Sequence, residues 1–139
     1  YNGSMSGASL RRAIRQAMAE AGVPPEDLGH VNAHGASTVA DDAMEARALQ
    51  ATVPDVPVAA PKSFFGSLGA SSGAVEMAVS VLSFCGGLVP ATLNYTRPDP
   101  CCPVKVVAGQ PLTEPKPAAL LVNWTTVGQA AAMVVAGIE

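Results

Sequence analysis

Aromatic residues, charged residues and cysteines are all scarce in this sequence, and each shortage excludes a class of protein. Three Phe, two Tyr and one Trp among 139 residues leave the core to be filled by Ala, Val, Leu and Gly. Charged residues make up 14% of the chain and no basic cluster exceeds Arg11-Arg12, which argues against a nucleic acid partner. The three cysteines have no Cys-x-x-Cys spacing, so they predict neither a disulfide framework nor a zinc site.

The sequence also lacks a long uninterrupted apolar run. The longest, at about residues 74–82, is too short and too punctuated to span a bilayer, so we expect no membrane partner. No signal peptide is visible, and the cysteine pattern fits a reducing compartment, which predicts a cytoplasmic location. Residues 1–139 are one domain in length, and because the chain begins with Tyr1 we expect it to be a piece of a longer protein.

What the sequence does contain is an alternation of helical and strand-like segments. Spacing of three and four residues between apolar positions predicts an amphipathic helix at 9–21, which Gly22 and Pro24-Pro25 end. Further helices are expected at 41–51 and 70–85. Short strands are expected at 30–33, 56–60, 88–93, 104–107, 118–123 and 131–136. This alternation predicts an α/β layered domain with a mixed sheet.

Two of these segments carry more specific expectations. Apolar residues lie almost all round the helix at 70–85, so we expect it to be buried on most sides, with Cys85 as a small core residue. Pro90 interrupts the segment 88–93 and predicts an edge strand there. Residues 109–117 are expected to be a loop, and the last two strands to form a hairpin across 124–129.

Polar residues follow the first two strands, at the end where open α/β sheets place their ligands. His34 can donate or accept a proton near neutrality, and Lys62 precedes a run of small residues that leads into a helix. The helix N-terminus adds unpaired N–H groups, so the stretch predicts a site for an anionic or carbonyl-bearing ligand. A tightly packed crossover without chemistry is the alternative. His30 has no expected role, and no metal-ligand set is apparent, because its spacing from His34 would suit a helix whereas this stretch is expected to be a strand.

Several motifs in order along the chain resemble those of the β-ketoacyl-acyl-carrier-protein synthases. The segment Lys-Ser-x-x-Gly-x-Leu-Gly-Ala-x-x-Gly-Ala-Val-Glu at 62–76 is similar to the family segment that carries a lysine and the second catalytic histidine. Residues 31–38 are similar to the Asn-Ala-His-Gly-Thr-Ser-Thr signature, with Ala36 for the first threonine, and Asp42 and Glu45 fit the acidic positions after it. Residues 90–100 look like Pro-Pro-Thr-Ile-Asn…Pro-Asp-Pro. The resemblance, over about residues 14–135, implies the C-terminal half of a thiolase-like condensing enzyme, a three-layer α-β-α fold with a five-stranded mixed sheet.

In that family a cysteine in the N-terminal half takes the acyl chain, and two histidines support decarboxylation of malonyl-carrier protein and the Claisen condensation. The resemblance implies that His34 is the first histidine and that Lys62 is the family lysine, paired with Glu76. It further implies catalytic residues His34, Lys62, Ser67 and Glu76, and substrate-binding residues Ser37, Thr38 and Val127. It implies no cofactor and no metal. The implied partners are an acyl carrier protein with its acyl and malonyl groups, the protein's own N-terminal half and, at full length, a second copy in a dimer.

Two departures from the family pattern bear on activity. Ser67 stands where the family has its second histidine, and a serine hydroxyl cannot carry a proton's charge near pH 7. The family's Asn-Ser-Phe-Gly-Phe-Gly-Gly loop stands here as Asn-Trp-Thr-Thr-Val-Gly-Gln at 123–129, which suggests an altered gate to the acyl pocket. None of the three cysteines occupies a nucleophile elbow.

Three functions remain open on the sequence alone. The first is a condensing-enzyme half in fatty acid or polyketide synthesis, impaired or repurposed at Ser67. The second is a non-catalytic subunit, comparable to the chain-length factors that shape a partner synthase, and the third is a stable fragment without activity of its own. We expect no condensation by these 139 residues alone, an ion pair between Lys62 and Glu76, and a common cavity for His34, Ser67 and Lys62.

Overall fold

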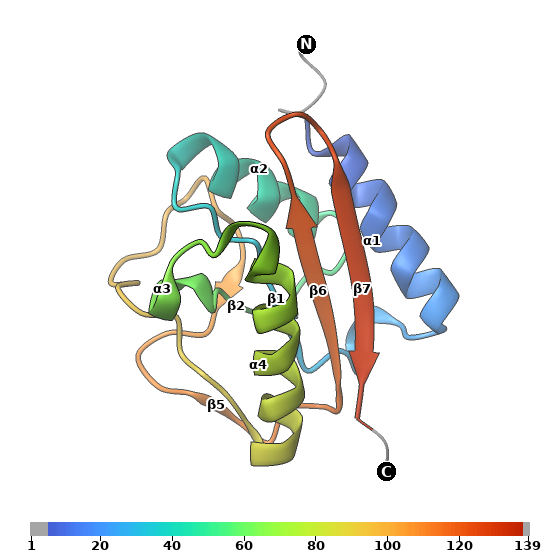
Figure 1. Cartoon of the computed structure of the whole chain (residues 1–139), viewed down its shortest axis with the longest axis vertical. Coiled ribbons are helices and arrows are strands. Elements are labelled where there is room, and N and C mark those ends of the chain that lie inside the picture. Colours follow the sequence, from blue (N-terminus) through green and yellow to red (C-terminus); the bar gives the residue numbers. More distant parts are fainter. Residues whose placement is uncertain (1–5, 138–139) are drawn as a thin grey trace.

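The computed structural model describes residues 6–137, in which a five-stranded sheet is covered by helices on both faces (Figure 1). The strands have the order β4-β2-β1-β6-β7; the first four are parallel, and β7 is antiparallel to β6. They comprise β1 (His30–Asn32), β2 (Pro57–Ala59), β4 (Lys105–Val106), β6 (Ala118–Trp124) and β7 (Ala130–Ala136). The mixed α/β sheet expected from the sequence is therefore confirmed.

Helices α1 (Ala8–Ala21) and α2 (Val39–Gln50) lie on one face of the sheet, and α4 (Ser72–Gly86) lies on the other (Figure 1). Gly22 takes the left-handed conformation at the end of α1, with φ 64°, and its N–H donates to the carbonyl groups of the last turn. Thr38 caps α2, because its Oγ1 accepts a hydrogen bond from the Asp41 N–H at 3.2 Å. Gly22 therefore ends α1 as expected, whereas the hydroxyl cap at Thr38 was not among the expectations.

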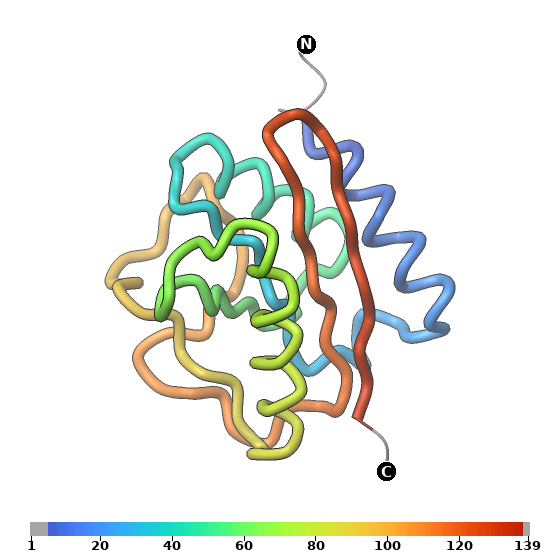
Figure 2. The backbone as a smooth tube through the Cα atoms, viewed as in Figure 1, coloured from blue at the N-terminus to red at the C-terminus, as the bar shows by residue number. Residues whose placement is uncertain are grey.

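The main hydrophobic core lies between the sheet and the α1–α2 layer. Figure 2 shows the β6–β7 hairpin running beside α1, although the two are at opposite ends of the chain. Leu10 and Ile14 of α1 are buried against Leu120 and Val122 of β6 in one cluster. Aliphatic side chains dominate this cluster, in keeping with the scarcity of aromatic residues.

Helix α4 corrects the expectation of a helix buried on most sides. Its buried residues are polar and follow one stripe: Ser72, Glu76, Ser80 and Ser83. Met77, Val81 and Leu82 are exposed, Leu82 to 67%, whereas Phe84 is half-buried against the ring of His30. Cys85 is also exposed and is not a core residue. Apolar periodicity identified the helix correctly, but the face that meets the sheet is the polar one, because polar groups of β1 and Lys62 lie beneath it.

The segment after α4 also differs from expectation. Only Leu88–Val89 form a strand, β3, which pairs antiparallel with β5 (Leu112–Thr113) in a separate two-stranded sheet. Residues 88–89 are therefore an edge strand, although of this separate sheet and not of the main one, and 109–117 is not wholly a loop. Pro90 has no N–H to continue the ladder, which ends β3 at Val89. The short helix α3 (Lys62–Phe65) and the 3₁₀ turns η2 (Pro25–Asp27) and η3 (Gly69–Ser71) complete the elements.

No helix within residues 6–137 has both the length and the apolar character that crossing a bilayer requires.

Candidate active site

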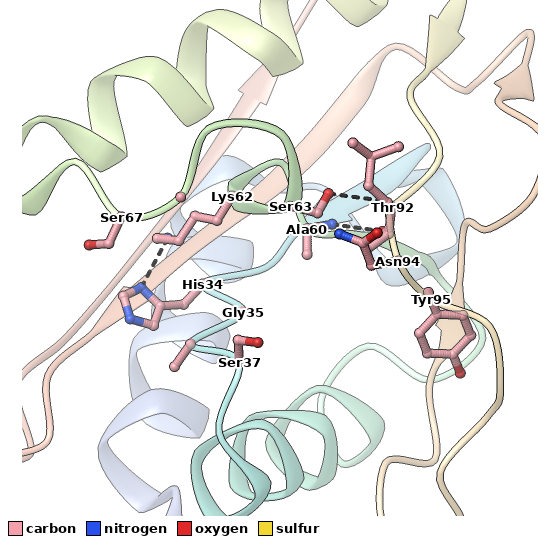
Figure 3. A pocket seen from close by; sticks show the side chains of 13 residues that line it. His34, Gly35, Ser37, Ala60, Lys62, Ser63, Ser67, Thr92, Asn94 and Tyr95 are labelled. Carbon is pink, nitrogen blue, oxygen red and sulfur yellow. Dashed lines mark hydrogen bonds between the residues drawn. The ribbon is translucent and has the colours of Figure 1, made fainter.

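The carboxyl ends of β1 and β2 open into a cavity of about 580 Å³ (Figure 3). His34 follows β1, and Lys62 begins α3 just after β2. Ser67, from the loop after α3, lines the same cavity. The common cavity expected for these three residues is therefore confirmed, because parallel strands bring their carboxyl ends to one edge of the sheet.

The backbone beside His34 is held by a buried carboxylate. Glu45 of α2 accepts hydrogen bonds from the N–H groups of His34, at 2.7 Å, and Gly35, at 2.9 Å. Burial raises the pKa of Glu45 to about 7, although these two hydrogen bonds favour the charged form. Gly35 has φ 53°, and a Cβ there would lie 3.0 Å from the Cβ of Ala60. The chain can therefore turn sharply after His34 and keep its imidazole at the edge of the cavity.

Lys62 determines which nitrogen of His34 carries the proton. Its Nζ lies 3.3 Å from His34 Nδ1 (Figure 3). An ammonium group only donates hydrogen bonds, so Nδ1 is the acceptor and a neutral imidazole carries its proton on Nε2. Burial, and secondly the charge of Lys62, lower the pKa of His34 below its usual value, although a hydrogen bond with the side chain of Asn123 acts in the opposite direction. His34 is therefore a neutral N–H donor at neutral pH.

Glu76 completes a buried chain of polar contacts. Its carboxylate forms the predicted ion pair with the Lys62 ammonium, and both side chains are buried. Asn123, at the carboxyl end of β6, donates to Glu76 Oε2 at 3.3 Å. Burial raises the pKa of Glu76, while Lys62 and Asn123 act in the opposite direction. The pair keeps a positive charge beside the His34 imidazole.

Two asparagines join this chain that the predicted site residues did not include. Asn32 Nδ2 donates to the Glu76 backbone carbonyl at 2.7 Å and to Ser80 Oγ at 3.0 Å. Asn123 joins through Glu76, as described above. Both lie at or near the carboxyl ends of strands that neighbour each other in the sheet, and that position was the signal in the sequence.

The far wall of the cavity comes from the segment after β3. Thr92 Oγ1 accepts a hydrogen bond from the Ala60 N–H at 3.1 Å, and Ser63 Oγ accepts one from the Leu93 N–H at 3.0 Å. These contacts fasten the segment to β2 and α3, and they bring Asn94 and Tyr95 to the cavity wall (Figure 3). The cavity is thus lined by hydroxyl, amide and phenol groups as well as by His34 and Lys62.

The three predicted substrate-binding residues do not share one place. Ser37 lines the cavity, with φ 63°. Thr38 caps α2 and is not among the lining residues. Val127 lies in the turn between β6 and β7, where it is 67% exposed, and it does not line this cavity either. Their roles in binding stay predictions.

The sequence of this chain is similar to the sequences of a known protein family. Residues 2–96 match the family described as "Beta-ketoacyl synthase, C-terminal domain". The chain belongs to the β-ketoacyl synthase family. It is 36% identical over 108 residues to 3-oxoacyl-[acyl-carrier-protein] synthase 2 of Synechocystis sp., covering 75% of this chain and 26% of that protein. It is 39% identical over 112 residues to the synthase of the same name from Mycobacterium leprae, covering 79% of this chain and 26% of that protein.

Solved structures agree with this assignment. The structure described as the ishigamide ketosynthase/chain length factor superposes with a TM-score of 0.88 at 27% identity, over 93% of this chain and 32% of that one. A type II PKS acyl-carrier protein in complex with its ketosynthase gives a TM-score of 0.88 at 26% identity, over 96% of this chain and 34% of that one. The predicted thiolase-like, three-layer α-β-α fold with a five-stranded mixed sheet is confirmed. The chain spans about a quarter of the length of the curated relatives it matches.

Within the β-ketoacyl synthase family, the nucleophile expected for condensation is a cysteine. None of the cysteines in residues 6–137 lines the cavity; Cys85 and Cys101 are exposed, and Cys102 is partly buried in a loop. The described residues also contain no cluster of three or more His, Cys, Asp or Glu side chains that could hold a metal ion. The groups that this chain brings to the cavity are hydrogen-bond donors and one buried ammonium.

Proposed function

We propose that the chain is the C-terminal half of a synthase that decarboxylates malonyl-carrier protein and condenses the product with an acyl group, in fatty acid or polyketide synthesis. The chain of contacts from Glu76 through Lys62 to His34 carries this proposal. It places the proton of a neutral His34 imidazole on Nε2 at a residue that lines the cavity, and an uncharged donor of this kind can stabilise an oxyanion without giving up its proton. The nucleophilic cysteine would come from the N-terminal half.

The reaction can be written with the groups present. In the first step the bond between the malonyl α-carbon and its carboxylate breaks, CO₂ leaves, and the electron pair passes to an enolate of the thioester. His34 Nε2–H donates to the developing enolate oxygen. The enolate carbon then attacks the carbonyl of an acyl group held as a thioester on the cysteine. A carbon–carbon bond forms, and the carbon–sulfur bond to the enzyme breaks.

Ser67 weakens this machinery in the proposal. It lines the cavity where the family pattern places a second histidine, and its hydroxyl offers one short-reaching donor. Loss of one preorganised donor to an oxyanion typically costs ~2.7–4 kcal/mol of barrier, or roughly a hundredfold to a thousandfold in rate. We therefore infer that the full-length protein is a slow or repurposed synthase.

A non-catalytic subunit is the second candidate, and the same serine favours it. Two of the similar solved structures contain a chain length factor, including one described as a ketosynthase in complex with its chain length factor. In this alternative the protein shapes the acyl pocket of a partner, and its own N-terminal half has no cysteine at the nucleophile position. The residue at that position separates the two candidates.

The outer face of α4 is a candidate contact surface for the N-terminal half of the protein. Met77, Val81 and Leu82 are exposed there, and a groove of about 320 Å³ beside them runs to Met133 of β7. Contiguous exposed apolar surface of this kind usually marks an interface. We infer that the N-terminal half covers this face, and that the complete protein forms a dimer and receives its substrates on an acyl carrier protein.

Decarboxylation by the full-length protein tests the proposal. We expect slow release of CO₂ from malonyl-carrier protein, a large further loss in His34→Gln, and a gain of up to about a hundredfold to a thousandfold in Ser67→His. Ser71→His is the matched control, because it adds an imidazole to the same loop at an exposed residue that does not line the cavity. Wild-type activity at ordinary synthase rates would contradict the inferred impairment, and no activity in any variant would favour the non-catalytic subunit.

A further inference from the structure

The single tryptophan of the chain lies against His34. The ring centroids of Trp124 and His34 are 5.1 Å apart, and the two planes are inclined at 54°. These values fall within the range of tilted aromatic pairs, in which the edge of one ring meets the face of the other. In the β-ketoacyl synthase pattern given above, the corresponding loop residue is a serine, so this ring contact is a feature of the present chain.

Trp124 is well placed to act as a fixed support. It is the last residue of β6, paired with Ala130 across the hairpin, and only 7% of it is exposed. Its side chain belongs to the main core cluster with Leu10 and Met44, on the face of the sheet covered by α1 and α2. An indole held by two helices and a strand has little freedom to rotate.

The other contacts of His34 do not act on the face of its ring. Glu45 accepts from its backbone N–H, Lys62 donates to Nδ1, and the side chain of Asn123 forms a further hydrogen bond with it. Hydrogen bonds to ring nitrogens lie in the plane of the imidazole, so they resist a tilt of that plane less than a ring packed against its face does. A rigid aromatic surface against the imidazole removes this tilt.

We propose that Trp124 is a positioning residue for His34, whose indole fixes the plane of the imidazole and so directs Nε2–H into the cavity that Ser67 lines. The effect on reaction rate rests on the proposed function, whereas the effect on the orientation of His34 does not. The two can therefore fail separately.

NMR of the full-length protein with labelled histidine tests the orientation directly. In the wild type we expect nuclear Overhauser contacts from the indole to the His34 ring protons, a ring-current shift of those protons, and nitrogen shifts of the Nε2–H tautomer. His34→Gln assigns the signals. Trp124→Phe should retain the ring-current shift, whereas Trp124→Leu should lose it and change the Overhauser contacts between the His34 ring and the Lys62 side chain. The Nε2–H tautomer should persist in both variants, because Lys62 still donates to Nδ1.

The rate of malonyl-carrier decarboxylation provides a second readout. Displacement of a catalytic group by about 1 Å can cost roughly a hundredfold in rate, so we expect kcat of Trp124→Leu to fall roughly tenfold to a hundredfold with KM unchanged. Trp124→Phe should stay within about threefold of the wild type. Leu120→Ala is the control for lost packing, because Leu120 is fully buried in the same strand and has no ring contact with His34.

Two results would overturn the proposal. The first is the absence of indole-to-His34 contacts in the wild-type spectrum, which needs no variant to fold. The second is a Trp124→Leu protein whose His34 signals match those of the wild type. If the His34 signals change as expected while no variant decarboxylates malonyl-carrier protein, the proposed function fails and the positioning role of Trp124 stands.

Discussion

Helices α1 and α4 flank opposite faces of one sheet, and they present opposite sides of themselves to it. Helix α1 buries Leu10 and Ile14 and leaves Arg12 and Arg15 in solvent. Helix α4 buries three serines and Glu76 and leaves Met77, Val81 and Leu82 exposed. The first arrangement is that of an ordinary amphipathic surface helix, and the second is its reverse.

The difference follows from what each helix has to contact. The strands beneath α1 present aliphatic side chains, so its apolar face has a core to join. Beneath α4 lie His30, Asn32 and the Lys62 ammonium, and these buried polar groups need hydrogen-bond partners. A polar stripe on α4 supplies them, which leaves Met77, Val81 and Leu82 exposed on the outer face. The candidate site and the proposed interface with the N-terminal half therefore share one helix.

The largest effect in this comparison should come from the charged pair under α4. Glu76→Leu leaves the buried Lys62 ammonium without its carboxylate, which should lower the free energy of unfolding by about 3–5 kcal/mol. Urea unfolding of the 139-residue chain measures the loss. The double variant Lys62→Met with Glu76→Leu should recover most of it, because no unpaired charge remains. A Glu76→Leu protein as stable as the wild type would show that the Lys62–Glu76 pair is not buried in solution.

On the α1 side, the matching test removes apolar volume. Ile14 is fully buried, so Ile14→Ala should cost about 2–5 kcal/mol in the same unfolding experiment. Ala19, exposed on the same helix, provides the control, since Ala19→Ser should change stability by less than about 0.5 kcal/mol. Equal effects at the two positions would contradict the orientation of α1.

The polar layer under α4 should also make stability depend on pH. Burial lowers the pKa of His30 from 6.5 to about 4, so between these values the unfolded chain binds a proton that the folded chain does not. Stability should then fall as the pH drops from 6.5 towards 4, by about 1.4 kcal/mol for each pH unit attributable to His30. His30→Gln should lack this part of the slope. If stability had the same pH dependence in His30→Gln as in the wild type, His30 would be exposed to solvent and not buried.

The smallest effect is expected on the outer face of α4. In the 139-residue chain, Leu82→Ala should change the free energy of unfolding by no more than about 0.5 kcal/mol, because Leu82 is 67% exposed. In the full-length protein the same substitution should cost clearly more, since we infer that the N-terminal half covers this face. Equal effects in the two proteins would contradict an interface on this face of α4, although the polar stripe of the helix would still face the sheet.

Much of the architecture could be predicted from local patterns. The helix expected at 9–21 is observed as Ala8–Ala21, and the last strand, expected at 131–136, is observed as Ala130–Ala136. The expectation that His34 and Lys62 share a cavity was also correct, because both follow parallel strands. Residues 88–93 were predicted less well: two residues form a strand, and their partner β5 is too short for its own pattern to reveal it.

The amino-acid sequence by itself determined the three long helices, the glycines that end α1 and α4, and the positions of His34 and Lys62 directly after strands, because these depend on residues close together in the chain. Only the tertiary structure decided which face of α4 turns inward and that Asn123 and Trp124 reach the site from the far hairpin. Apolar periodicity shows that a helix has an apolar stripe, but it does not show which part of the protein covers that stripe. Asn123 contacts Glu76 from 47 residues away, and such contacts depend on the order of strands in the sheet, which no local pattern encodes.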